Sequence, residues 1–233
     1  KFGVLAVLIV VPCIGAVMGT VNGALIVYGR LQPFIVTLAM MVGALGLARV
    51  IAGQDTAVYP VYTGSNATEN FEVLRELLWG VVPVPGLFFL GVLLVFFLVT
   101  RFTTFGSYLM AIGGNEEAAI LSGIRTNLIK VMTFCLSGAA AGLAGVISVS
   151  RISMAEPQAG AGMEREAIAA VILGGTSIMG GAGAVWRSVS GVLLMALIGN
   201  GFNILNVNPF FKDLTTGVII VIAVALAASA SRR

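Results

Sequence analysis

The sequence predicts an all-α protein, a polytopic bundle of about seven transmembrane helices. Hydrophobic residues make up 58% of the 233 residues and charged residues only 10%, whereas a soluble domain carries about 25% charged residues. Apolar runs of roughly span length recur along the whole chain. Glycine is frequent, at 30 residues, as expected where helices pack closely inside a membrane.

The expected spans follow from the positions of the apolar runs. A helix needs about 20 apolar residues to cross a bilayer, and most of the runs approach or exceed that length. The predicted spans are residues 2–28, 33–51, 84–100, 128–149, 167–179, 186–204 and 214–229. Because the first run is longer than the apolar core of a signal peptide, about 7–15 residues, we expect a true span and an N-terminally incomplete chain.

The fifth run, residues 167–179, is too short for an ordinary span. It would cover about 20 Å at about 1.5 Å per residue, against a hydrocarbon core of about 30 Å. Gly174 and Gly175 also interrupt it. A short, glycine-broken segment is typical of a transport pathway, but an ordinary span extended by polar ends remains an alternative.

Two further local patterns make structural predictions. Gly15, Gly19 and Gly23 recur every fourth residue, so they share one helix face and should lie against another helix. Gly138 and Gly142 form a second pair of this kind. In the polar loop 52–83, an amphipathic helix is expected over residues 69–79.

The segment 101–130 separates two apolar runs and carries its own short helix signal. Asn115 is a good N-cap, and the acidic residues Glu116 and Glu117 suit the positive end of a helix dipole. Gly123 stands where a left-handed residue would end the helix. From the residues alone, this helix either packs on its own protein or contacts a partner.

Composition argues against most enzyme and nucleic-acid functions. The chain has no histidine and a net charge of only +3, and no acid–base–nucleophile set or metal cluster stands out, so no catalytic or metal residues are predicted. Cys13 and Cys135 each lie inside an apolar run, where a packing role is expected. No phosphate-binding G-x-x-x-x-G-K-[ST] motif occurs, so an active transporter would need ATP hydrolysis by another subunit.

Three blocks of sequence resemble the permease subunits of ribose-type bacterial ABC sugar importers. Residues 113–119 read GGNEEAA, followed by SGI at 122–124. Residues 164–177 read EREAIAAVILGGTS, followed by GGAG at 180–183. Residues 32–40 read QPFIVTLAM. The blocks span most of the chain, but they do not indicate which sugar is carried.

The resemblance implies a single transmembrane permease domain over residues 1–233, with residues 101–130 as a cytoplasmic coupling loop. It implies a multi-pass protein of the bacterial inner membrane that forms the pathway for a monosaccharide such as ribose. The implied partners are a cytoplasmic ABC ATPase, which binds the ATP, a periplasmic sugar-binding protein and a second permease subunit, with no nucleic acid. Basic residues divide almost evenly between the two sides, so the orientation rests mainly on the resemblance.

The resemblance assigns residues to ATPase docking, and the chemistry of a sugar together with the glycine-broken run suggests residues of the pathway. The expected ATPase-docking residues are Asn115, Glu116, Glu117, Ala118, Ala119, Leu121 and Gly123. An uncharged sugar needs hydrogen-bonding side chains rather than ions, so polar and glycine residues are expected along its pathway. These are Gln158, Gly174, Gly175, Thr176, Ser177, Asn200 and Asn203. A sodium-coupled carrier and a non-transporting membrane scaffold remain the alternative functions.

Overall fold

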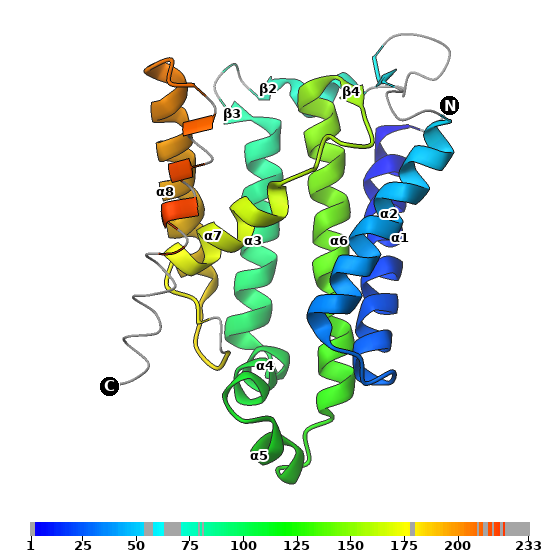
Figure 1. The fold of residues 1–233 in the computed structure, drawn as a ribbon, viewed down its shortest axis with the longest axis vertical. Coiled ribbons are helices and arrows are strands. Elements are labelled where there is room, and N and C mark those ends of the chain that lie inside the picture. The colour runs from blue at the N-terminus through cyan, green and yellow to red at the C-terminus, as the bar shows by residue number, and fades with distance from the viewer. Residues whose placement is uncertain are drawn as a thin grey trace. The chain divides into compact units, whose positions relative to one another are not determined.

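The structure is a computed structural model, drawn as a ribbon in Figure 1. The chain divides into two compact units. It describes residues 3–53, 58–62, 71–78, 80, 82–177, 180–208, 210–211, 214–215, 217–219 and 221. Unit 1 comprises Lys1–Leu94 and Arg125–Gly160, and unit 2 comprises Val95–Ile124 and Ala161–Arg233.

Five helices within the described residues are long and apolar enough to cross a membrane. They are α1 (Val4–Val27), α2 (Pro33–Ala52), α3 (Val84–Phe102), α6 (Thr126–Ile152) and α8 (Val185–Ile204). Five predicted spans are therefore found, with ends that differ by a few residues. The predicted span 214–229 lies largely outside the described residues.

The fifth predicted run forms a helix that is shorter than a span. Helix α7 (Met163–Leu173) has 11 residues, about 16 Å at about 1.5 Å per residue. Its C-cap is Gly174, and Gly175 follows with a positive φ of 85°, a conformation that glycine adopts at little cost. The two glycines therefore end α7 rather than interrupt a continuous helix.

Unit 1 is built on close packing between α1 and α6. A Cβ atom added to Gly15 or Gly19 would overlap backbone carbonyl oxygens of α6, those of Gly138 and Phe134 respectively. A Cβ on Gly23 would lie 2.9 Å from the Cα atom of Val131. The prediction that this glycine face contacts another helix is confirmed, and Gly138 and Gly142 belong to the opposing face.

Short elements close one end of unit 1. The 3-10 helix η1 (Phe71–Arg75) is followed by strand β2 (Leu77–Leu78), which pairs with β3 (Val82–Pro83). Strand β1 (Tyr59–Pro60) pairs with β4 (Met154–Ala155).

The predicted α-helix over residues 69–79 is wrong for the part that the structure describes. Phe71 and Leu74 are buried with Val146, as their spacing indicates, but a 3-10 turn also aligns residues i and i+3. Gly80, with a φ of 72°, allows the tight turn that pairs Leu78 with Val82 and ends the helical path. Residues 69 and 70, at the start of the expected helix, lie outside the described residues.

Unit 2 contains the end of α3 and the helices α4 (Thr104–Gly114), α5 (Glu116–Leu121), α7 and α8. Helix α4 was not predicted, because its 11 residues lie in a segment interpreted as polar loop. Helices α7 and α8 pack closely, since a Cβ on Gly191 of α8 would overlap the carbonyl oxygen of Ala170.

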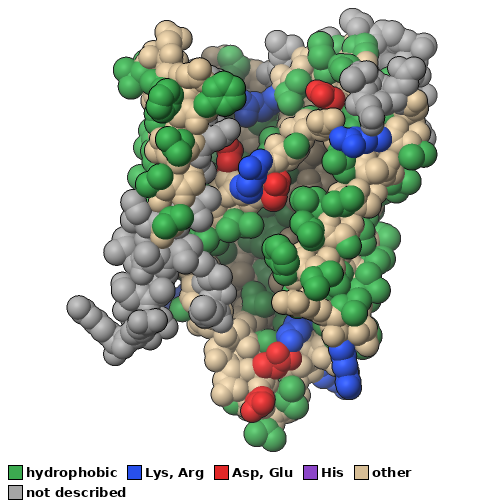
Figure 2. Space-filling model, in the orientation of Figure 1, with side chains coloured by type: hydrophobic (Ala, Val, Ile, Leu, Met, Phe, Trp, Pro, Cys, Tyr) green, Lys and Arg blue, Asp and Glu red, His purple; other side chains and the backbone are tan. Residues whose placement is uncertain are grey.

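The outward faces of the long helices are strongly apolar. Leu5 of α1 is 73% exposed and Ile51 of α2 is 77% exposed. Figure 2 shows apolar side chains spread over the visible face, while charged side chains occur in a few clusters. Such faces are stable only in an apolar environment, so the described fold is that of a polytopic helical membrane protein.

Candidate functional site

Helix α5 is defined by the residues that the sequence indicates. The Asn115 Oδ1 atom accepts a hydrogen bond from the Ala118 N–H at 3.0 Å. Glu116 and Glu117 occupy the first turn, and Gly123 has a positive φ of 80° just after the helix. The predicted cap and helix are therefore confirmed.

The exposed surface of α5 differs from the predicted docking face at one position. Leu121 is 89% exposed and Ile120 is 54% exposed, and Glu117 and Ala118 are also exposed. Ala119 is only 4% exposed, because the chain folds back here and the Ile124 N–H donates to the Ala119 carbonyl at 3.1 Å. Ala119 is therefore not on the exposed surface of α5, whereas Ile120 is, and the docking role of these residues stays a prediction.

Helix α4 links α5 to the glycine-rich segment after α7. Asn115 directly connects α4 and α5, since it is the C-cap of one and the N-cap of the other. Near this junction, a Cβ on Gly113 would lie 2.5 Å from the Gly181 backbone nitrogen. Gly180 and Gly181 both have positive φ values. The end of α4 and residues 180–181 therefore touch through their backbones.

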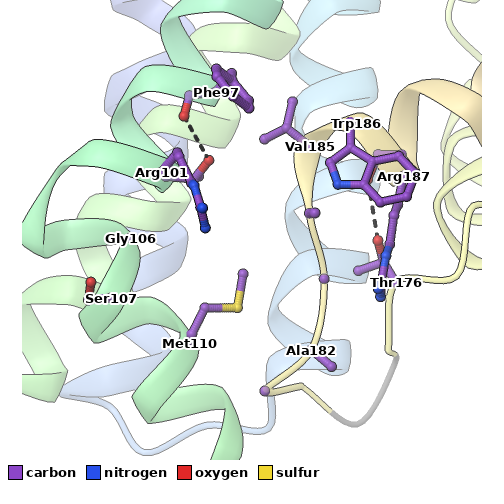
Figure 3. A pocket seen from close by; sticks show the side chains of 15 residues that line it. Phe97, Arg101, Gly106, Ser107, Met110, Thr176, Ala182, Val185, Trp186 and Arg187 are labelled. Carbon is purple, nitrogen blue, oxygen red and sulfur yellow. Dashed lines mark hydrogen bonds between the residues drawn. The ribbon is translucent and has the colours of Figure 1, made fainter.

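The larger cavity of unit 2 has a volume of about 940 Å³ (Figure 3). One wall comes from the end of α3 and from α4, with Phe97, Arg101 and Met110. The facing wall comes from Thr176, residues 181–184 and the start of α8. Figure 3 shows the labelled side chains of the two walls on opposite sides of the opening.

Cationic and hydroxyl groups line this larger cavity. Arg101 and Arg187 stand on its two walls, and the Arg187 Cζ atom lies 5.6 Å from the centroid of the Trp186 ring. The Thr176 and Ser188 hydroxyl oxygens are 3.4 Å apart. The cavity therefore offers hydrogen-bond donors and positive charge beside an aromatic surface.

A smaller cavity of about 530 Å³ lies between α7 and α8. Its polar lining residues are Glu166 of α7 and Asn200 and Asn203 of α8, surrounded by methionine, alanine and other apolar side chains. The amides can both donate and accept hydrogen bonds, which suits a neutral polar ligand. In the described part of the chain, no group of three or more His, Cys, Asp or Glu residues could hold a metal ion.

A family comparison accounts for almost the whole chain. The family described as "branched-chain amino acid transport system / permease component" matches residues 2–224. The chain belongs to this permease family.

Curated relatives of the permease carry sugar-transport names. The ribose import permease protein RbsC of Escherichia coli (strain K12) is 40% identical over 91% of this chain and 65% of its own length. RbsC of Bacillus subtilis (strain 168) is 40% identical over 88% of this chain and 62% of its own length. The D-allose transport system permease protein AlsC of E. coli (strain K12) is 38% identical over 91% of this chain and 63% of its own length. The resemblance to sugar permeases is confirmed.

The permease chain spans a little under two thirds of the length of these relatives. No solved structure gives a significant match to it. Family membership and five apolar helices together establish a multi-pass membrane protein.

The structure distributes the predicted pathway residues of the permease over several places. Thr176 lines the larger cavity, and Asn200 and Asn203 share the smaller one. The Ser177 N–H donates to the Ala182 carbonyl at 2.8 Å in the turn after α7. Gly174 packs against the Arg187 carbonyl at the start of α8, and Gly175 is exposed. Gln158 is exposed and belongs to unit 1.

Sequence reasoning missed three lining residues, Arg101, Arg187 and Trp186. The signal that could have found them is their position at the ends of apolar runs, where basic and aromatic residues meet the polar boundary of a membrane. Glu166 could not be predicted as a lining residue, because it shares the smaller cavity with Asn200 only through the packing of α7 against α8.

Proposed function

We propose that the chain is the membrane-spanning part of a permease subunit in an ATP-driven ABC importer of a monosaccharide such as ribose. The observation that carries this proposal is the 40% identity with ribose import permeases over about nine tenths of the chain. Relatives named for allose and arabinose transport keep the choice of sugar open.

The proposed partners follow from this assignment. A cytoplasmic ABC ATPase would supply the hydrolysis, since this sequence has no phosphate-binding loop motif. A periplasmic sugar-binding protein would deliver the sugar, and a second permease subunit would complete the pathway. The protein would reside in the bacterial inner membrane.

We assign ATPase docking to α5. Its exposed Leu121 and Ile120 provide an apolar contact surface, and the Asn115 cap holds the short helix in shape. The connection through α4 to residues 180–181 would carry a displacement of α5 toward the ends of α7 and α8. The coupling loop, residues 101–130, would face the cytoplasm.

We assign the sugar pathway to the α7–α8 region. Asn200 and Asn203 in the smaller cavity are the best-supported pathway residues, since their amides match sugar hydroxyl groups. Thr176, Ser177, Gly174 and Gly175 would shape the turn after α7. Gln158, in unit 1, remains a proposed pathway residue without a described contact to this region.

The test is uptake by the full-length permease in proteoliposomes with its ATPase and binding protein. Vesicles would be offered labelled ribose, allose or arabinose with ATP, with a non-hydrolysable ATP analogue, or with a sodium gradient alone. We expect uptake of one sugar only with hydrolysable ATP. Uptake driven by sodium without ATP would replace the proposal by a secondary carrier, and no uptake of any sugar, despite wild-type assembly, would reject it.

A further inference from the structure

We propose that the larger cavity of unit 2 binds the phosphate group of an anionic phospholipid, with Arg101 and Arg187 as its cationic ligands. This site differs from the sugar pathway assigned to the smaller cavity. It rests on the membrane location of the chain and not on the identity of any transported sugar.

The first argument is that the described residues supply no counterion to the positive charge in this cavity. Within the described ranges, neither Arg101 nor Arg187 forms an ion pair. Both side chains line the same cavity from facing walls (Figure 3). Two guanidinium groups in the lining of one cavity favour an anion with several acceptor oxygens, and phosphate is such an anion.

The second argument concerns the start of α8. Arg187 lies in the first turn of this 20-residue helix, where the dipole is positive and a cation is unfavourable. The first turn contains no acidic residue, and the Ala184 N-cap has no side chain that could accept from the free N–H groups. An anion bound beside Arg187 would satisfy both the guanidinium and this helix end.

The third argument is the position of the cavity along the spans. Arg101 lies in the last turn of α3, and Arg187 lies in the first turn of α8, so both stand at ends of apolar helices. Trp186, 62% exposed, stands beside them, and tryptophan is enriched at membrane–water interfaces. Basic pockets between membrane helices at this depth are suited to anionic headgroups.

The lining also distinguishes a lipid from a small soluble ligand. Phe97, Met110 and Val185 add apolar surface next to the arginines. A phospholipid presents acyl chains and glycerol to such surface, whereas inorganic phosphate would leave it uncovered. A neutral sugar would leave the two guanidinium charges without a counterion.

The experiment uses Trp186 as a reporter in the purified full-length permease. Trp79 and any other tryptophan are replaced by phenylalanine, so that the remaining emission comes from Trp186. The protein is titrated in mixed micelles with phosphatidylglycerol carrying brominated acyl chains, which quench tryptophan on contact. Phosphatidylethanolamine with the same chains provides the zwitterionic comparison. Inorganic phosphate and ribose are added as competitors.

We expect brominated phosphatidylglycerol to quench at several-fold lower mole fraction than the zwitterionic lipid. Arg101→Gln and Arg187→Gln should each weaken this preference about fivefold, because each removes one cationic contact near the headgroup. Arg101→Lys and Arg187→Lys should retain most of it, which separates charge loss from misfolding. Arg125→Gln is the matched control, because it removes an exposed arginine that does not line the cavity, and it should behave as wild type.

Two results would overturn the proposal. Equal quenching by the two brominated lipids in the wild type would show that the headgroup is not recognised. Relief of quenching by millimolar phosphate or by ribose would assign the cavity to a soluble ligand instead. Normal sugar uptake together with equal quenching would reject this lipid site and leave the transport function standing.

Discussion

At the scale of single residues, the shape of α5 depends on the Asn115 cap and on the turn that follows the helix. The Asn115 cap follows from an interaction three residues along the chain, so the sequence contains all that determines it. The burial of Ala119 depends on the chain folding back at Ile124. Arg101 and Arg187 are 86 positions apart in sequence, and only the packing of unit 2 brings them to one cavity.

Leu121 gives the residue-scale prediction for ATPase docking. Leu121→Asp should reduce ATPase association and sugar uptake about tenfold or more, because it places a carboxylate in an apolar contact of a kind that contributes about 1–3 kcal/mol. It should leave membrane insertion unchanged, since Leu121 is 89% exposed. Co-purification of the ATPase with the permease measures association, and vesicle uptake measures transport.

Asn127→Asp is the control for this change. It adds a carboxylate on the same stretch of chain, at an exposed position in the first turn of α6, where negative charge is favourable. Association near the wild-type level is expected for the control. If Leu121→Asp also retained the ATPase, α5 would lie outside the docking surface.

At the scale of elements, the sequence predicts helix faces better than it predicts their partners. The four-residue glycine spacing identifies the contact face of α1, but not that α6 presents Gly138 to it. In the loop before α3, an apolar i, i+3 pair fits both an α-helix and a 3-10 turn, and the pairing of Leu78 with Val82 decides between them. That pairing is a contact between two segments, so the apolar spacing within one segment does not reveal it.

Gly19 provides the prediction for the α1–α6 contact. Gly19→Ala should lower the thermal stability of the purified permease by about 1–3 kcal/mol, the usual cost of overpacking, because its Cβ would overlap the Phe134 carbonyl oxygen. The melting transition in detergent provides the measurement.

Gly46→Ala in α2 is the matched control, since a Cβ there meets nothing within 4 Å. Alanine also has a higher helix propensity than glycine by about 0.5–1 kcal/mol, so the control should be neutral or slightly stabilising. Equal melting of the two variants would mean that the contact between α1 and α6 is looser than the structure places it.

At the scale of the whole molecule, composition determines the class and packing determines the sites. Hydropathy alone locates the five long helices of the described chain. The larger cavity could not be predicted, because it joins α3 and α4 to a segment that is distant in sequence. The smaller cavity lies between the consecutive helices α7 and α8, and its shape depends on how these two helices pack. Helix α4 was missed for a related reason, since its glycines are ordinary loop signals unless their close contacts are known.

The contact between Gly113 and Gly181 gives a prediction about coupling in the assembled importer. Gly113→Ala should reduce uptake per ATP hydrolysed several-fold, because its Cβ would lie 2.5 Å from the Gly181 nitrogen and force the backbones apart. Uptake and hydrolysis would be measured on the same vesicles containing the full-length permease and its partners.

Gly114→Ala is the neighbouring control, because its Cβ would lie 4.0 Å from the Gly181 Cα atom, an ordinary contact. It makes the same chemical change one position later in α4. An unchanged ratio of uptake to hydrolysis in Gly113→Ala would show that coupling does not depend on the contact between Gly113 and Gly181.

The junction between α4 and α5 has a mechanical consequence. The Asn115 N–H donates to the Ala111 carbonyl at 3.0 Å, and its own carbonyl accepts from the Ala119 N–H at 3.1 Å. One residue thus closes the last turn of α4 and opens the first turn of α5. No flexible linker separates α4 from α5, so a movement of α5 would pass directly to α4. Such a junction transmits small movements between the two helices, but it does not tolerate the insertion of a residue.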